Sequence, residues 1–336
     1  MQLTAARAAI AGAALAALLA AGPARAEGVD VATTHTLWHE APTRTRMTVY
    51  TPAVDASATP WEWLTVRGGW EADVVSGASV SVKAGPAYQA TSGAADVIST
   101  ASVYDLRNVG RGGFTLRKEN VSVTAGYTYG TENDYRSHSF NVAARTETYE
   151  HNTIFELSYA RNFDSVCDRV QASGALPVRF RALEGSEGCF TGTDPLRTTR
   201  AVQIDGYQGS WSQSWTPSFV TQLTYTGQII NGFQSNPYRS VILGQGVRAQ
   251  EYVPENRARH SLTARANYYL KPLKAALRFG VRGFWDTWGI AAVNVEAEAE
   301  KYLGEVFRVG LRARGYKQSG ALFWSDDYTG GDPPLG

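Results

Sequence analysis

Residues 275–318 read AALRFGVRGFWDTWGIAAVNVEAEAEKYLGEVFRVGLRARGYKQ, and this stretch decides the fold. It contains three runs, 275–286, 290–302 and 306–318, in which apolar residues alternate with polar or charged ones. Successive residues of a β-strand point to opposite faces, so each run predicts a strand with one apolar face and one charged face. A strand of about 9–11 residues is long enough to cross a bilayer at a tilt.

The charged faces of the three runs complement one another. Guanidinium groups on the outer runs would flank carboxylates on the middle run, and opposite charges across strands stabilise a sheet. The charged residues are Arg278, Arg282, Glu296, Glu298, Glu300, Arg308, Arg312 and Arg314. A soluble sandwich would bury the apolar face against a second sheet. A membrane barrel would turn that face to lipid and keep the charges in a wet lumen, and the rest of the chain favours the barrel.

The composition agrees with a barrel and argues against other classes. The chain has 336 residues, a net charge of +1, 33 Gly and many aromatic residues. After the N-terminal segment, no apolar run approaches the ~20 residues of a transmembrane helix. The near-neutral charge, without a basic stripe interleaved with stacking aromatics, predicts no nucleic-acid partner.

The first 26 residues predict a signal peptide. Arg7 gives a positive start, 8–21 is apolar, and Ala-Arg-Ala at 24–26 is a cleavage site. The mature chain then begins at Glu27, and 27–336 forms the barrel. We expect export to the outer membrane of a Gram-negative bacterium. The expected partners are the barrel-assembly machinery, outer-membrane lipid and lipopolysaccharide.

Alternation and turn signals predict an all-β fold, a transmembrane antiparallel up-and-down β-barrel. Its strands lie near 31–39, 44–54, 62–73, 111–118, 120–131, 136–148, 152–163, 201–214, 218–230, 257–269, 275–286, 290–302 and 306–318. Short connections alternate with longer polar ones, as periplasmic turns and extracellular loops do. With an odd number of strands the last would end outside, near Ser319. We therefore expect a complete barrel of roughly 14–16 strands and a chain truncated at its C-terminus.

The two cysteines, Cys167 and Cys189, share one predicted loop. In an oxidising compartment we expect a disulfide between them. Closing a loop of about 20 residues would contribute about 3 kcal/mol in the chain-entropy description. The alternative is a metal pair, but no His or further Cys lies near them in the sequence.

Another predicted loop contains two similar units, D-V-V-S-G-A-S at 73–79 and D-V-I-S-T-A-S at 96–102. One interpretation is a loop folded over or inside the lumen, whose carboxylates offer oxygen ligands or cation contacts. The other is that each Asp makes a hydrogen bond that shapes its own turn. The candidate residues are Asp73, Ser76, Ser79, Asp96, Ser99 and Ser102.

Three arginines, Arg239, Arg257 and Arg259, flank the predicted loop 231–256. Because a guanidinium group can bind phosphate or carboxylate with two hydrogen bonds, they could contact anionic lipopolysaccharide or a ligand. They could equally pair with Glu251, Glu255 or the carboxylate of another loop.

Common enzyme motifs are absent from the sequence, including the zinc-protease, P-loop and nucleophile-elbow patterns. We expect no cofactor and no enzymatic activity. His138 lies between two serines near an outer loop, so a hydrolase at the barrel rim is the least favoured alternative. Otherwise His138 is a polar residue at the membrane interface.

Several motifs together resemble the DUF3570 family of bacterial outer-membrane β-barrels of unknown function. The motifs are the two units at 73–79 and 96–102, E-N-D-Y-R-S at 132–137, N-P-Y-R at 236–239 and P-E-N-R-A-R at 254–259. The resemblance implies an outer-membrane barrel, and it implies no substrate and no catalytic residue. Members of the family continue beyond the region equivalent to 326–332 to an aromatic end, which is consistent with the expected truncation.

The favoured function is a passive or loop-gated pore whose lumen is zoned by the charges of 275–318. Mixed charge predicts weak ion selectivity, because rings of a single sign give strong selectivity. A second hypothesis is a surface binding or adhesion barrel with a plugged lumen, which would use the loops 74–110, 164–200 and 231–256. The partner would then be a surface ligand in place of a small solute.

Overall fold

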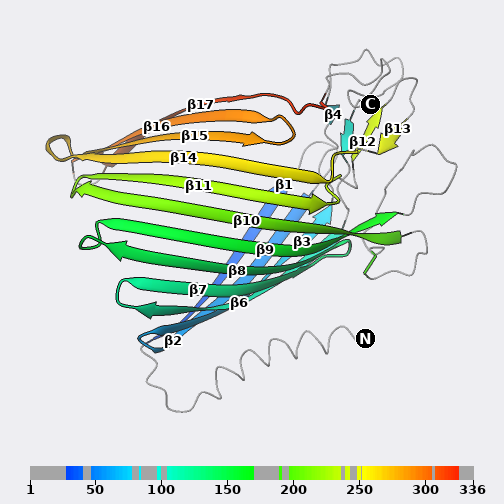
Figure 1. Cartoon of the computed structure of the whole chain (residues 1–336), viewed down its shortest axis with the longest axis horizontal. Coiled ribbons are helices and arrows are strands. Elements are labelled where there is room, and N and C mark those ends of the chain that lie inside the picture. The colour runs from blue at the N-terminus through cyan, green and yellow to red at the C-terminus, as the bar shows by residue number, and fades with distance from the viewer. Residues whose placement is uncertain are drawn as a thin grey trace.

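The main element of the computed structural model is one antiparallel sheet of 13 strands (Figure 1). The described residues are 28–40, 47–77, 83–84, 97–99, 104–169, 189–190, 197–235, 239–242, 248–250, 252–304 and 307–324. The predicted signal peptide, 1–26, lies outside them. In the part of the chain that is described, no helix has the length and apolarity needed to cross a membrane.

Each interior strand of the sheet pairs with the sheet strands that come before and after it in the sequence, which is up-and-down connectivity. The strands are β1 (Val29–Glu40), β2 (Met47–Trp61), β3 (Leu64–Gly77), β6 (Tyr104–Lys118), β7 (Val121–Thr131), β8 (Tyr135–Thr148), β9 (Thr153–Arg169), β10 (Arg197–Thr216), β11 (Phe219–Gly232), β14 (Asn256–Leu270), β15 (Ala275–Asp286), β16 (Ala291–Leu303) and β17 (Phe307–Gln318). A short 3-10 helix, η1 (Lys271–Leu273), forms the turn between β14 and β15.

The predicted strands are all present, and the prediction of an all-β up-and-down fold is confirmed. Several predicted boundaries are wrong by four to seven residues, and the two largest errors are in β2 and β6. The strand predicted at 44–54 continues to Trp61, and the strand predicted at 111–118 begins at Tyr104. The first error arises because 52–60, with a proline at each end and small residues between, has the composition of a turn.

Pro52 lies inside β2, in the interior of the sheet, where proline is unusual because it has no N–H to donate. It is paired with His35 of β1, but the pairing of β2 with β3 passes from Tyr50 to Ala53 without it. A side-chain contact joins the strands at this gap, where the Thr51 hydroxyl donates to Asp73 Oδ1 at 2.6 Å.

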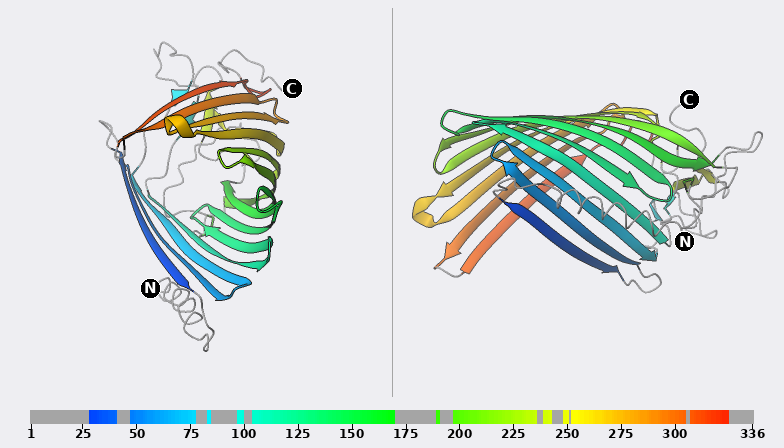
Figure 2. Two further views of the ribbon diagram at one scale, coloured as in Figure 1. Left: turned by 90° about the vertical axis from the view of Figure 1, so that its left-hand side faces the viewer. Right: turned by 90° about the horizontal axis from the view of Figure 1, so that it is seen from below.

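The sheet curves into a trough with β1 and β17 at its two edges (Figure 2). Within the described residues no pairing joins these two edge strands. Because strand directions alternate and the number of strands is odd, β1 and β17 run in the same direction. The connections at one end of the strands, here called the turn end, are all tight turns. The long connections leave from the other end, the loop end, which also has the short β7–β8 and β15–β16 connections (Figure 1).

Side-chain exposure separates the two faces of the sheet. Along β16 the burial pattern alternates, with Val293 and Val295 exposed and Glu296, Glu298 and Glu300 partly shielded. A curved sheet shelters the side chains on its concave face, so the carboxylates line the trough and the valines cover its outside. This is the reverse of a soluble protein, in which charged residues are almost always exposed.

Aromatic pairs lie on the exposed surface at both ends of the strands. At the turn end, Trp61 stacks on Trp63 with ring centroids 5.4 Å apart, and Phe219 meets Tyr268 at 6.0 Å. Nearer the loop end, His260 stacks on Trp285 at 5.5 Å. Two levels of amphipathic rings are typical of the girdles at the interfaces of membrane barrels.

A second sheet of four strands forms at the loop end (Figure 1). Its strands are β4 (Lys83–Ala84), β5 (Val97–Ser99), β12 (Arg239–Ile242) and β13 (Arg248–Gln250). The central pairing joins β5, from the connection between β3 and β6, to β12, from the connection between β11 and β14. We call this element the loop sheet, and it links connections that emerge on either side of β7–β10. The sequence predicted a folded loop here but not its partner.

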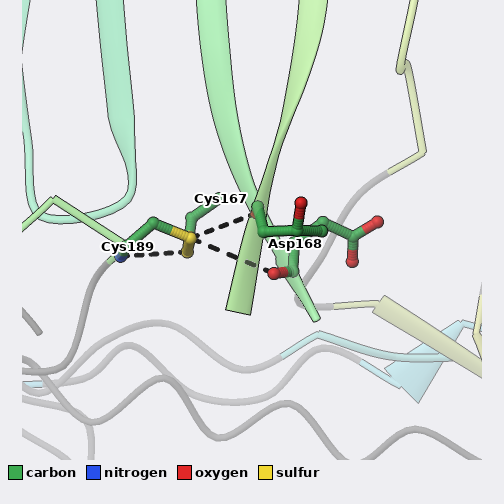
Figure 3. The surroundings of a disulfide bond; sticks show 4 residues. Cys167, Asp168 and Cys189 are labelled. Carbon is green, nitrogen blue, oxygen red and sulfur yellow. Dashed lines mark hydrogen bonds between the residues drawn. A yellow bond between two sulfur atoms is a disulfide. The ribbon is translucent and has the colours of Figure 1, made fainter. Parts of the chain in front are cut away.

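Cys167 and Cys189 form the predicted disulfide at the loop end of β9 (Figure 3). Their Cα atoms are 5.4 Å apart, and Cys167 is 1% exposed. The Cys189 N–H donates to Cys167 Sγ at 3.0 Å. The Cys167 N–H donates to the carbonyl of Asp134 at 2.7 Å, which attaches the β7–β8 connection to the same place.

We expect the double variant Cys167→Ser/Cys189→Ser to lose about 3 kcal/mol of unfolding free energy, because the unfolded chain is no longer constrained by a closed loop. Urea unfolding of the protein folded in lipid vesicles measures this loss. Dithiothreitol should destabilise the unchanged protein by a similar amount and leave the double variant unaffected. Equal stability of the oxidised protein and the double variant would contradict the prediction.

Candidate pore lining

The concave face of β15–β17, here called the charged wall, carries the charges that the sequence pattern singled out. The strand register places Glu298 between Arg278 and Arg312, and Glu296 between Gly280 and Arg314. A slip of one residue would move every one of these charges to the outer face, so the alternation itself fixes the register.

The charged wall is cross-linked by ion pairs. Arg278 pairs with Glu298 and, at 3.2 Å, with Glu300. The other pairs are Arg312 with Glu296 at 2.7 Å and Arg308 with Glu300 at 3.5 Å. The guanidinium groups remain partly exposed, and such pairs contribute only about 0.2–1 kcal/mol each. Their main effect is therefore on the electrostatic potential inside the trough, and their effect on the stability of the fold is small.

A second charged region lies on the concave face of β2, β3 and β6. Arg111 contacts both oxygens of Asp55 at 2.7 Å and lies 3.7 Å from Glu71. Space for this contact comes from Gly69, where a Cβ would lie 2.4 Å from Asp55 Oδ1. The group was not predicted, because the strand expected at 44–54 leaves Asp55 in the following connection. Arg107 and Arg111 are four residues apart and so share one face of a strand, and this spacing was the signal that could have revealed the group.

Asp73 belongs to the same region. It accepts the Thr51 hydroxyl and pairs with Arg107 at 3.3 Å, while Arg107 also lies 3.4 Å from Glu132. These contacts of Asp73 join neighbouring strands and differ from the turn-shaping bond, while the proposed contact of Asp73 with a cation stays a prediction. Within the described residues no group of His, Cys, Asp and Glu is arranged to hold a metal.

The remaining residues of the two D-V-[VI]-S units are only partly described. Ser76 lies in β3 and Ser99 in β5. Ser79, Asp96 and Ser102 lie outside the described residues. The interpretation of the second unit as a folded loop agrees with its pairing to β12, but its proposed cation contacts stay a prediction.

Between the two charged regions, the middle of the concave face on β7–β11 carries mainly hydroxyl and amide side chains. Ser139 donates to Asn162 at 2.7 Å, for example. A hollow of about 500 Å³ lies in this region. Gly206 and Ala160 face each other across β9 and β10 there and leave room on the wall.

Of the three arginines predicted to contact an anion, Arg257 has a partner within the protein. It pairs with Asp286, and its guanidinium carbon lies 3.9 Å from the Trp288 ring centroid. The Arg257 side chain is 10% exposed and that of Asp286 is 0% exposed. This pairing corresponds to the alternative of a carboxylate partner within the protein, and anion contact by Arg257 stays a prediction. Glu255 instead pairs with Arg200 at 2.6 Å.

Asp286 also organises the β15–β16 connection. Its Oδ1 accepts the backbone N–H groups of Trp288 at 3.0 Å and Ile290 at 2.9 Å. Arg259, on the neighbouring strand β14, donates to Gln228 at 3.2 Å and borders the 500 Å³ hollow. Arg239 belongs to β12, where the described part is its backbone. Anion contact by Arg259 and Arg239 stays a prediction.

His138 lies on the outer, apolar face of β8. Its Nδ1 is 2.6 Å from the Tyr127 hydroxyl, and its ring is 4.9 Å from that of Tyr129. Ser137 and Ser139 belong to the opposite face, because neighbouring residues of a strand alternate. The histidine is thus placed among aromatic residues near the loop end and apart from the two serines.

Comparison of the structure with solved structures found outer-membrane proteins with low sequence identity. OmpTdeltaL8, a loop deletion mutant of the Vibrio cholerae outer membrane protein OmpT, has 12% identity and a TM-score of 0.41, with 88% of this chain and 95% of that chain covered. OccK8 (OprE) of Pseudomonas aeruginosa has 10% identity and a TM-score of 0.42, with 84% and 76% covered. OccAB1 of Acinetobacter baumannii has 11% identity and a TM-score of 0.37, with 88% and 93% covered.

Sequence comparison gave one family and no curated relative. No curated protein matches the chain. The family model described as "Protein of unknown function (DUF3570)" matches residues 1–333, which is nearly the entire chain. The chain therefore belongs to the DUF3570 family.

Proposed function

We propose that the protein is a passive pore in the outer membrane of a Gram-negative bacterium, with its entrance controlled by the loop sheet. The observation that carries the proposal is the distribution of side chains over the two faces. Apolar residues cover the outside of the trough, whereas ion pairs, amides and hydroxyls line its inside. The polar inner face suits water and polar solutes, and the apolar outer face suits hydrocarbon.

This location brings further proposed partners. The barrel-assembly machinery would insert the strands, and lipid with lipopolysaccharide would surround the outer face. The predicted signal peptide, 1–26, would direct export.

The charges of the proposed lumen are balanced locally. Arg278, Arg308 and Arg312 each lie beside a glutamate of β16, and Arg111 lies beside Asp55. Strong ion selectivity requires rings of one sign, so this lining would pass cations and anions almost equally.

The first test is current across a planar lipid bilayer that contains the folded protein. We expect stepwise conductance and a reversal potential near zero under a salt gradient. The triple variant Glu296→Gln/Glu298→Gln/Glu300→Gln leaves the arginines of the charged wall unbalanced, so its reversal potential should shift towards anion selectivity. Glu62→Gln, in the exposed β2–β3 turn, is the matched control and should behave like the unchanged protein.

A correctly folded, membrane-inserted protein that carries no current would overturn the pore. The surface binding or adhesion function would then be favoured, because the loop sheet is a folded element at the loop end of the barrel. Retained current with an unchanged reversal potential in the triple variant would instead show that the charged wall does not line the path.

The second test concerns gating by the loop sheet. Ile98 and Ser240 are directly opposite each other in the β5–β12 pairing, and opposed residues of antiparallel strands have the spacing a disulfide needs. Oxidation of Ile98→Cys/Ser240→Cys should hold the two loops together and suppress transitions between conductance levels about tenfold or more.

Dithiothreitol should restore these transitions in the double variant. The controls are the single variant Ile98→Cys and the unchanged protein with dithiothreitol, which also reduces the native disulfide. If the cross-link forms and the transitions persist at the original frequency, the loop sheet is not the gate.

A further inference from the structure

The hollow of about 500 Å³ on the concave face differs from the rest of the trough in its charge. Its only charged lining residues are Arg259 of β14 and Arg282 of β15, with no Asp or Glu among the described residues that line it. Both arginines belong to the concave face, since Arg259 is opposite Gln228 and Arg282 is opposite Thr263 in the register.

Both arginines have few hydrogen-bond partners within the protein, and no ion pair is formed by either among the described residues. Arg259 donates one N–H to Gln228, and its Nε is buried without a hydrogen-bond partner. Arg282 makes a long contact of 3.5 Å to the Ser261 hydroxyl. A guanidinium group has five N–H donors, so several donors remain for a ligand.

Asp286 does not neutralise the pair, although it is opposite Arg259 in the register. Its Oδ2 binds Arg257, and its Oδ1 accepts two backbone N–H groups of the β15–β16 connection. The N–H groups of Arg259 and Arg282 that face the hollow have no carboxylate partner in the described part of the chain, and an incoming oxyanion would supply acceptors for them. Guanidinium groups suit carboxylate and phosphate oxygens because they donate two parallel hydrogen bonds.

The other side of the hollow is neutral and polar. Its lining includes Asn141, Ser158, Gln208 and Thr226, which offer both donors and acceptors for hydroxyl groups. Gly206 and Ala160 keep this side open. Ligand sites commonly have volumes of about 300–1,000 Å³, so the hollow is large enough for a small organic molecule.

We propose that this hollow is a binding site for small hydroxylated organic anions, in which Arg259 and Arg282 hold the carboxylate and the amide and hydroxyl side chains of β8–β11 hold the hydroxyl groups. The proposal rests on the proposed pore and names the class of solute that the pore would take. The site would raise the local concentration of such anions in a lumen that is otherwise balanced in charge.

The test measures binding of gluconate, which has one carboxylate and several hydroxyl groups, to the full chain folded in detergent micelles. Isothermal titration calorimetry reports binding whether or not the protein conducts. We expect the double variant Arg259→Gln/Arg282→Gln to weaken gluconate binding by at least about tenfold, because charge-assisted hydrogen bonds are lost. Glucose, without the charge, and propionate, without the hydroxyl groups, should each bind at least tenfold more weakly than gluconate.

Arg145→Gln is the matched control. Arg145 is also an arginine of a strand, but it lies near the turn end of β8 and pairs with Glu147 at 2.7 Å. The Arg145→Gln variant should bind gluconate as the unchanged protein does. Circular dichroism and heat-modifiable migration in electrophoresis check that each variant is folded.

Three outcomes would overturn the site: no gluconate binding by the folded protein, equal binding by the double variant, or equal loss of binding in Arg145→Gln. Gluconate binding without bilayer current would contradict the pore and leave the site in place. Current without gluconate binding would contradict the site and leave the pore in place.

Discussion

A sheet of 13 strands with its apolar side chains outermost is stable only where that face meets hydrocarbon. In water, the same face would leave a large area of valine, leucine and aromatic side chains without a partner, which soluble monomers avoid. The backbone adds a second requirement. Inside a bilayer every amide must find its partner within the protein, and continuous antiparallel pairing provides this along the wall. The hydrocarbon of the bilayer therefore requires both the alternation of apolar and polar residues and the continuous pairing of the strands.

The interior of the trough follows from the same constraint. Once alternate residues face lipid, the remaining residues must face one another and water, so they are polar. On β15–β17 they form ion pairs such as Arg312 with Glu296, and on β2–β6 Arg111 contacts Asp55 beside Gly69. Between these regions the wall has amides and hydroxyls, and its two incompletely satisfied arginines, Arg259 and Arg282, border a hollow. The chemical zones of the wall thus lie side by side around the trough.

Much of this arrangement is present in the sequence because a period of two residues is a local property. The run AVNVEAEAE in β16 shows which residues share a face, and its neighbours show which charges would meet. Interactions between distant segments leave no such local signal. The loop sheet joins Val97–Ser99 to Arg239–Ile242, and strands of three or four residues are too short for alternation to be recognised. Around Pro52 a local signal was present but misleading. The turn-like composition of this segment led to a predicted strand that included only about half of β2.

The candidate site shows the same division. The ion pairs of the charged wall could be anticipated, because both partners lie on adjacent, strongly alternating strands. The pairing of Arg257 with Asp286 was harder to predict from the sequence. Asp286 lies at the end of β15, where a carboxylate can bind the backbone of the following connection as well as a neighbouring strand. The hollow depends on Gly206 and Ala160 being opposite each other in β9–β10 while Arg259 and Arg282 lie on β14 and β15. That combination requires the register of several strands at once.

Nitroxide scanning of residues 293–300 in the protein folded into lipid vesicles tests the membrane orientation of the sheet most directly. Single labels at Val293, Val295, Ala297 and Ala299 should collide with oxygen dissolved in the hydrocarbon. Labels at Asn294, Glu296, Glu298 and Glu300 should collide with a water-soluble nickel chelate. A clear alternation with this phase supports an apolar face in lipid and an ionic face in water. Labels of both parities that respond alike, or an apolar set shielded from both reagents, would contradict it.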